Sequence, residues 1–292
     1  MPGAKLDLKT LDDLIRRALA EDVGPGDVTT AALIDPKLRG GARLVAREGG
    51  ILAGMPVIRR LLRTFDTRLR LWEALPDGTR LKKDMVIATL RGPVASMLAV
   101  ERTLLNFLQR LSGIATLTRR YVDAVAGTGV KILDTRKTLP GWRGLSKYAV
   151  AVGGGVNHRM GLYDQVLIKD NHLRALRELH ALPEQAVAMA KARLKRRRKI
   201  RFEVEVETVD DAEGAARAGA DIVMLDNMPP ARMKEAVKAI RALSGRTIIE
   251  ASGRISLKNV RAAARTGVDW ISIGAITHSA GALDISLDME TG

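Results

Sequence analysis

The feature that most constrains the fold is a change of rhythm after Val130. Six short apolar runs recur from there on, with helical stretches between most of them. The runs are Lys131–Leu133, Val166–Ile168, Arg201–Val206, Ile222–Leu225, Thr247–Ile249 and Trp270–Ile273, and the helical stretches are Glu184–Leu194, Asp210–Ala218, Ala231–Leu243 and Leu257–Ala264. Alternating strands and helices predict parallel strands joined by right-handed crossovers. Because the series stops short of eight units, the sequence predicts an incomplete α/β barrel.

The region before Val130 predicts a small α+β unit. Thr10-Leu11-Asp12-Asp13 has the pattern of a helix N-cap, and Gly24-Pro25-Gly26-Asp27 ends that helix. The remaining elements expected here are strands at Ala42–Ala46, Leu69–Trp72 and Val86–Leu90, a short helix at Val57–Leu62, and a long helical segment from Val94 to about Ala126. We place the domain boundary in this last segment, giving an N-terminal domain of residues 1–112 and a barrel-like domain of residues 113–292. This leaves room for the last residues to pack back onto the N-terminal domain.

Charge and composition narrow the function. The net charge of +15 and isoelectric point near 10.4 suit either nucleic-acid binding or an anionic small substrate. Only 3% of residues are aromatic, which argues mildly against single-strand binding. The densest basic run, residues 193–199, fits a solvated helix end or, less well, a polyanion-binding patch. The chain has no cysteine, no membrane-length apolar run and no signal-peptide pattern, so a cytoplasmic setting is expected.

Polar side chains follow each predicted strand. They are Asp134, Arg136 and Lys137, then Lys169 and Asp170, Glu205 and Glu207, Asp226 and Asn227, Glu250 and Ser252, and Gly274. In α/β barrels the carboxyl ends of the strands build the active site. Helix capping or turns could account for Asp134, Asp226 or Ser252 singly, but not for Lys169, Glu205 and the Arg136-Lys137 pair. With His158 and Arg159, these cations predict a substrate that carries several negative charges.

Three local patterns leave their chemistry open. Ser252-Gly253 and Ser272-Ile273-Gly274 are strand–loop segments with small residues, as in phosphate sites, although Ser-Gly turns are common elsewhere. Glu205 and Asp226 end adjacent strands, which suits a Mg²⁺ site, stabilisation of developing positive charge, or simple charge balance. His158 follows three glycines and fits a structural or a functional role equally.

Several motifs in order resemble one family along nearly the whole chain. They are Glu21–Thr30, Glu101–Asn106, Thr135–Thr138, Lys147–Val150, Gly153–Arg159, Leu167–His172, Glu203–Glu207, Leu225–Asn227 and Gly274–Ser279. They are similar to quinolinate phosphoribosyltransferase, also called nicotinate-nucleotide pyrophosphorylase (carboxylating). The resemblance implies an N-terminal α/β sandwich domain, an open α/β barrel with the active site at the C-terminal strand ends, and a homodimer with shared active sites. It leaves further assembly into a hexamer open.

The resemblance also implies a reaction and roles. Phosphoribose passes from phosphoribosyl pyrophosphate to quinolinate with Mg²⁺, giving nicotinate mononucleotide, pyrophosphate and CO₂ in de novo NAD biosynthesis. The implied roles are a quinolinate clamp of Arg136, His158, Arg159 and Lys169; Arg102 entering from the neighbouring subunit; Lys137 and Lys169 facing the pyrophosphate; Glu205 and Asp226 lining the ribose and metal region; and Ser252, Gly253, Gly274 and His278 holding the 5′-phosphate.

Some positions depart from the family pattern. Leu139 stands where threonine is common, Val152 where cysteine is often found, and Arg254 where glycine or asparagine is frequent. None of them removes a charged site residue. A related family of molybdenum-transport operons shares the fold but lacks the Asn-His-Arg and Lys-Asp-Asn-His segments, so it ranks second. A nucleic-acid-binding protein is the alternative from a different class, and it has no need of carboxylates at strand ends.

Overall fold

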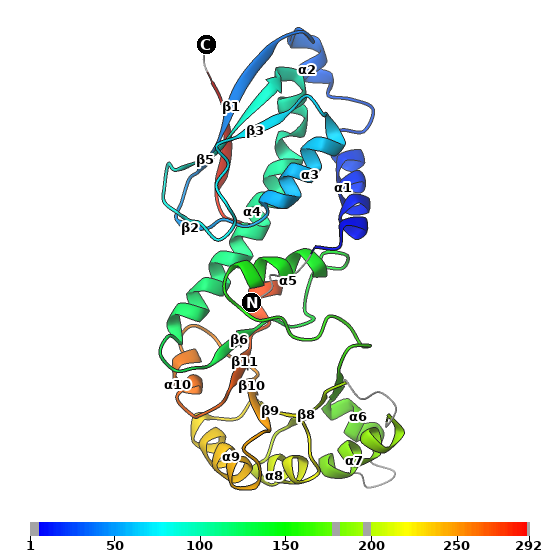
Figure 1. Cartoon of the computed structure of the whole chain (residues 1–292), viewed down its shortest axis with the longest axis vertical. Coiled ribbons are helices and arrows are strands. Elements are labelled where there is room, and N and C mark those ends of the chain that lie inside the picture. The colour runs from blue at the N-terminus through cyan, green and yellow to red at the C-terminus, as the bar shows by residue number, and fades with distance from the viewer. Residues whose placement is uncertain (1–5, 177–181, 195–199, 291–292) are drawn as a thin grey trace. The chain divides into compact units, whose positions relative to one another are not determined.

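The computed structural model describes residues 6–176, 182–194 and 200–290, and these form two compact units (Figure 1). Unit 1 holds the chain up to Arg119, Thr138–Gly154 and the chain from Ile276, and unit 2 holds Arg120–Lys137 and Gly155–Ala275. Most of the basic run, residues 195–199, lies outside the described residues, as do the first five. The domain boundary expected after residue 112 stays a prediction.

Unit 1 is built on an antiparallel sheet in the order β12-β1-β5-β3. Its strands are β1 (Arg39–Ala46), β3 (Arg70–Trp72), β5 (Val86–Pro93) and β12 (Ile285–Met289), and β2 (Gly50–Ile51) pairs separately with β4 (Arg80–Leu81). Its helices are α1 (Leu8–Asp22), α2 (Val28–Leu33), α3 (Met55–Phe65), most of α4 (Val94–Ala124), α5 (Arg143–Val152) and nearly all of α11 (Ala275–His278). The strand nearest the C-terminus therefore completes a sheet with the first strand of the chain.

Helix α3 shows how local sequence sets these elements. Gly54 precedes it in a left-handed conformation with φ of 118°, which glycine adopts without strain. The carboxylate of Asp77 accepts the N–H groups of Gly54 and Met55, both at 2.9 Å, and so satisfies donors that the first helical turn leaves free. Val57, Ile58, Leu61 and Leu62 then form its buried stripe.

The start of α1 differs from the prediction. Thr10 lies inside the helix, which begins at Leu8, and the predicted N-cap there is wrong. Asp7 sits at the boundary instead: its carbonyl accepts the N–H of Leu11 at 3.0 Å, and its carboxylate accepts the hydroxyl of Thr10 at 2.5 Å. The helix therefore begins three residues earlier than a Thr10 N-cap predicts.

Unit 2 contains a six-stranded, wholly parallel sheet in the order β6-β11-β10-β9-β8-β7. The strands are β6 (Lys131–Leu133), β7 (Val166–Ile168), β8 (Phe202–Val206), β9 (Ile222–Asp226), β10 (Ile248–Ser252) and β11 (Trp270–Ser272). Within the described residues β6 pairs with β11 and, through one parallel bridge, with Val156, whereas β7 pairs with β8; β6 and β7 do not pair with each other, so the ladder does not close. The predicted open, incomplete α/β barrel is confirmed.

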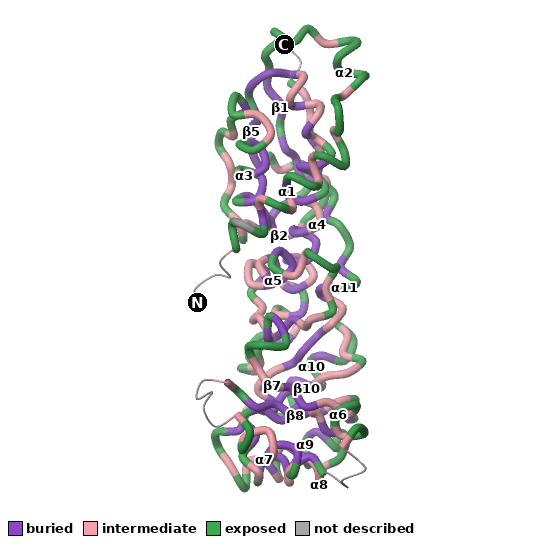
Figure 2. The backbone as a smooth tube through the Cα atoms, turned by 90° about the vertical axis from the view of Figure 1, so that its right-hand side faces the viewer, coloured by how far each residue is buried: buried purple, intermediate pink, exposed green. Residues whose placement is uncertain are grey.

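Helices and strands of unit 2 share one core. The helices are α6 (Asp170–Ala175), α7 (Pro183–Arg193), α8 (Val209–Arg217), α9 (Pro230–Leu243) and α10 (Val260–Ala264). Strand residues such as Val223, Leu225, Ile249 and Ile271 are fully buried, and the strands appear as a buried band in Figure 2. This near-continuous apolar character is typical of parallel strands covered on both faces. Every helix in the described part of the chain is too short or too polar to span a bilayer.

Candidate active site

Strand register places the polar residues of unit 2 on one face. Glu205 of β8 lies opposite Met224 of β9, and Glu250 of β10 lies opposite the same methionine. Side chains two apart on a strand share a face, so Glu203 and Glu205 belong to the face that also carries Asp226 and Ser252. The same rule brings Lys169 to the level of Glu205, because Leu167 pairs with Glu203.

These side chains line a cavity of about 590 Å³ at the carboxyl ends of the strands. Its lining residues are Thr135, Arg136, Lys137, His158, Arg159, Leu167, Lys169, Glu205, Met224, Asp226, Asn227, Ser252, Gly253, Arg254 and Ser272. Two buried polar atoms, Arg136 Nε and Ser272 Oγ, have no hydrogen-bond partner in the described part of the chain. Buried polar groups are normally hydrogen-bonded, so these two atoms suit a bound polar molecule.

Lys169, Glu205 and Asp226 form a charged cluster in this cavity. Lys169 Nζ donates to Glu205 Oε2, and Asp226 Oδ2 accepts from the side chain of Asn227 at 2.6 Å. Burial, followed by the charge of Glu205, raises the pKa of Asp226. Glu205 and Asp226 together are a hard-oxygen donor set that a divalent cation would stabilise.

Beneath the cavity, His158 meets two fully buried glutamates. Its Nε2 lies 3.1 Å from Glu203 Oε2 and 3.5 Å from Glu250 Oε2. Burial lowers the pKa of His158, but the hydrogen bond to Glu203 and the negative charges of Glu203 and Glu250 outweigh it and raise the pKa to about 10. Burial and the charge of Glu250 also raise the pKa of Glu203 to about 7. The Nε2–H faces the carboxylates, and the backbone nitrogen of Arg159 lies 2.8 Å from Nδ1.

A third buried acid, Asp134, anchors the loop that carries His158 and Arg159. Asp134 is fully buried just after β6, and its carboxylate accepts the backbone N–H of His158 at 2.8 Å and the side-chain amide of Asn157 at 2.7 Å. Helix capping, which could have explained Asp134 from the sequence, does not describe this role. The acid fixes the path of the loop, so His158 and Arg159 both enter the cavity.

The loop after β10 packs tightly against the end of β9. Gly253 has φ of 86°, and a Cβ there would lie 2.3 Å from Asn227 Oδ1 and 2.8 Å from its backbone nitrogen. The Asn227 N–H in turn donates to the carbonyl of Ser252 at 3.0 Å. Only glycine allows this approach, which brings the Ser252 side of the cavity up against Asp226.

Most residues proposed from the sequence meet in this one cavity. Arg136, Lys137, His158, Arg159, Lys169, Glu205, Asp226, Ser252 and Gly253 all line it. Gly274, which follows β11, is not among its lining residues, and Arg102 and His278 belong to unit 1. The roles proposed for all of these residues remain predictions.

Sequence reasoning missed Glu203 as a site residue. It also left Glu250 and Asp134 as strand-end polar residues without a role. Their one available signal was an acidic residue within an otherwise apolar run, as in Phe202-Glu203-Val204.

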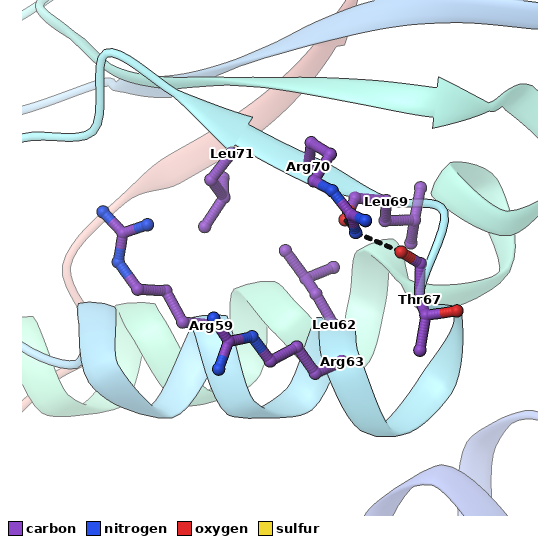
Figure 3. A pocket seen from close by; sticks show the side chains of 7 residues that line it. All are labelled: Arg59, Leu62, Arg63, Thr67, Leu69, Arg70 and Leu71. Carbon is purple, nitrogen blue, oxygen red and sulfur yellow. Dashed lines mark hydrogen bonds between the residues drawn. The ribbon is translucent and has the colours of Figure 1, made fainter.

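A second pocket, in unit 1, is a weaker candidate. It has a volume of about 470 Å³ between α3 and β3, and Figure 3 shows Arg59 and Arg63 on the helix with Arg70 on the strand. Arg70 is already engaged with the carbonyls of Thr67 and Leu69. All three arginines are exposed, and no carboxylate is among the lining residues, so nothing here is arranged for chemistry.

Comparison with known proteins matches one family over both parts of the chain. The family model of the quinolinate phosphoribosyl transferase N-terminal domain matches residues 27–112, and that of the C-terminal domain matches residues 114–288. A probable nicotinate-nucleotide pyrophosphorylase (carboxylating) of Bacillus subtilis is 42% identical over 96% of this chain and 93% of its own length. A quinolinate phosphoribosyltransferase (decarboxylating) of Nicotiana glauca is 38% identical over 96% of this chain and 83% of its own.

Solved structures match as well. The nicotinate-nucleotide pyrophosphorylase of Francisella tularensis superposes with a TM-score of 0.91 at 39% identity, covering 98% of each chain. Sequence and fold therefore agree over both units, and the chain belongs to the quinolinate phosphoribosyl transferase family.

Proposed function

We propose that this protein transfers phosphoribose from phosphoribosyl pyrophosphate to quinolinate and releases pyrophosphate and CO₂, as a pentosyltransferase of de novo NAD biosynthesis. The observation that carries the proposal is the cavity of unit 2, where five arginines and lysines, His158 and two carboxylates meet at the carboxyl ends of parallel strands. Family membership and the names of the relatives support the same reaction. The product besides pyrophosphate and CO₂ is nicotinate mononucleotide.

Quinolinate is assigned to Arg136, His158, Arg159 and Lys169. Burial, followed by the positive charge of Arg136, lowers the pKa of Arg159. Two guanidinium groups so close repel each other until anions lie between them, and quinolinate offers two adjacent carboxylates. Planar guanidinium forks match carboxylates in geometry and charge.

The phosphate-bearing donor is assigned to a second set of residues, which shares Lys169 with the quinolinate set. Lys137 and Lys169 face its pyrophosphate, and its 5′-phosphate is assigned to Ser252, Gly253, Gly274 and His278. The cramped loop of Gly253 supports this assignment, because it leaves backbone groups without a side chain to shield them.

Mg²⁺ is the proposed cofactor, held by Glu205 and Asp226 directly or through water. The hard oxygens fit this ion, and its charge would relieve the repulsion that raises the pKa of Asp226. When bound, Mg²⁺ neutralises charge on the pyrophosphate leaving group.

The chemistry then needs little more than positioning. The ring nitrogen of quinolinate attacks C1′ of the ribose as the bond to pyrophosphate breaks, and pyrophosphate leaves with the bonding electron pair. Glu205 and Asp226 stabilise the positive charge that develops on the ribose. The new ring cation accepts the electrons of the adjacent carbon–carboxylate bond, CO₂ leaves, and a proton takes its place on carbon.

A homodimer with shared active sites is part of the proposal. Arg102, an exposed residue of α4, is assigned to the neighbouring subunit's site. The cytoplasmic location expected from the sequence belongs to the proposal too.

One assay tests the function. The purified protein is incubated with phosphoribosyl pyrophosphate, Mg²⁺ and quinolinate, and nicotinate mononucleotide is measured; nicotinate replaces quinolinate in a parallel reaction. Turnover of quinolinate but not of nicotinate is expected, because nicotinate leaves one guanidinium group without a carboxylate. Absence of product, or tight binding of nucleic acid in its place, would favour the alternative suggested by the charge of +15.

A further inference from the structure

We propose that Glu203, a fully buried residue of β8, is the positioning residue that holds His158 and Arg159 in the acceptor site. This inference rests on the proposed function, because it assigns to these two residues the binding of quinolinate. It adds a residue that lies beneath the cavity rather than in its wall.

The first link runs through the histidine ring. Both ring nitrogens of His158 are in contact with these partners: Nε2 lies 3.1 and 3.4 Å from the two oxygens of Glu203, and Nδ1 lies 2.8 Å from the backbone nitrogen of Arg159. The ring therefore joins Glu203 to the backbone of Arg159. Its plane cannot turn without breaking one of these contacts.

The second link runs through Gln165 to the arginine side chain. The side-chain amide of Gln165 donates to Glu203 Oε2, and the backbone carbonyl of Gln165 accepts from Arg159 Nη1 at 3.2 Å. The two links close a ring from Glu203 through His158, Arg159 and Gln165 back to Glu203. The backbone and the guanidinium group of Arg159 are thus both held by the same carboxylate, the first through His158 and the second through Gln165.

A carboxylate is needed at this position for a geometric reason. Glu203 receives two donors: the Nε2–H of His158 lies 3.1 and 3.4 Å from its two oxygens, and the side-chain amide of Gln165 donates to Oε2. A glutamine would turn its own NH₂ toward one of the donors and break the ring there. Because Glu203 is fully buried, water cannot replace the lost acceptor.

Glu250 provides a matched control. It is also a fully buried glutamate facing His158 Nε2, at 3.5 Å, but in the described part of the chain neither of its carboxylate oxygens has a hydrogen-bond partner. Replacing Glu250 by glutamine removes the same group from the same cluster without opening the ring. The pair Glu203→Gln and Glu250→Gln therefore separates positioning from loss of buried negative charge.

The experiment compares steady-state kinetics and calorimetric quinolinate binding for the wild type and both variants. Glu203→Gln should raise the KM and Kd for quinolinate about 10- to 100-fold, as for a lost hydrogen bond to a charged group, with little change in the KM for phosphoribosyl pyrophosphate. Glu250→Gln should change quinolinate binding by a clearly smaller factor. In an Arg159→Ala background, Glu203→Gln should add little, because both changes remove the same contact.

Three results would overturn the inference. The two glutamine variants could weaken quinolinate binding equally, or Glu203→Gln could raise the KM for both substrates equally. The effect of Glu203→Gln on quinolinate binding could also be fully additive with that of Arg159→Ala. If circular dichroism shows that Glu203→Gln does not fold, Gln165→Ala opens the same ring, and it must then raise the KM for quinolinate selectively. A wild type that does not bind quinolinate overturns the proposed function itself, whereas an active wild type with a normal Glu203→Gln variant overturns only this inference.

Discussion

The tight approach of Gly253 to Asn227 gives a prediction whose size can be worked from the structure. In Gly253→Ala the new Cβ would lie 2.3 Å from Asn227 Oδ1, 2.5 Å from Cγ and 2.8 Å from the backbone nitrogen. The Asn227 side chain can rotate away, but its backbone nitrogen is held by the carbonyl of Ser252. The end of β9 must therefore move by several tenths of an ångström, beside Asp226.

Two contributions to the loss of stability in Gly253→Ala add together. A non-glycine residue at φ of 86° costs roughly 1–2 kcal/mol, and overpacking of a tight site costs roughly 1–3 kcal/mol more. We expect Gly253→Ala to lower the free energy of unfolding by about 2–5 kcal/mol. Because the shift falls on the proposed phosphate side of the cavity, it should also raise the KM for phosphoribosyl pyrophosphate more than that for quinolinate.

Two other glycines of unit 2 serve as controls. Gly127 has φ of 78°, and a Cβ there would have no atom within 4 Å, so Gly127→Ala isolates the backbone contribution. Gly245 has neither a positive φ nor a close neighbour, and Gly245→Ala should leave stability nearly unchanged. Denaturant unfolding and substrate kinetics of the three variants give the comparison. If Gly253→Ala were no less stable than Gly127→Ala and bound both substrates normally, the steric argument would be refuted.

Three further predictions concern charge. Mixing inactive Arg102→Ala with inactive Lys137→Ala protein should restore partial activity, since some mixed dimers regain one intact site; no recovery after confirmed subunit exchange would mean that each site comes from one chain. Arg159→Ala should mainly weaken quinolinate binding, whereas Glu205→Gln should lower turnover about 10²–10³-fold at saturating Mg²⁺; near-normal turnover would make Glu205 a structural charge. Hydrogen bonds from the guanidinium group of Arg68 hold the pKa of Asp66 well below its usual range. Its stabilisation is therefore present above about pH 4 and fades as the pH falls toward the folded-state pKa, so Asp66→Asn should cost stability at pH 7 and progressively less in acid, as measured by urea unfolding at several pH values.

The sequence predicted the strands of unit 2 well where their residues are apolar, and poorly where the site begins. The strand expected at Thr247–Ile249 runs from Ile248 to Ser252. Glu250 lies beneath the cavity against His158 and Ser252 lines the cavity, and both look like loop residues in the sequence. For the same reason β9 continues to Asp226, one residue past its prediction. Strand ends are hard to predict where function puts polar groups on the inner face of a sheet.

The buried acids were hidden for a related reason. An alternating glutamate in a strand is most often a surface residue, and nothing local to Glu203 says otherwise. Its burial depends on His158, 45 positions earlier, and on Glu250 of a strand that is not its neighbour in the sheet. The cations of the cavity could be found, because arginine and lysine just after apolar strands are unusual in themselves. Their supports could not, because those are defined only by the tertiary contacts.

The pairing of β12 with β1 has a consequence for the order in which the protein can fold during its synthesis. Ala42 lies opposite Met289 and Ala46 opposite Ile285, so the ribosome must make nearly the whole chain before this ladder can form. Until then β1 has one open edge, and an unpaired edge strand can recruit strands of other chains. Most of unit 2, by contrast, comes from the single stretch Gly155–Ala275 and can collapse as it emerges. A released chain that ends at residue 284 would thus expose the free edge of β1 although unit 2 is complete, and aggregation of such chains should begin from the N-terminal sheet.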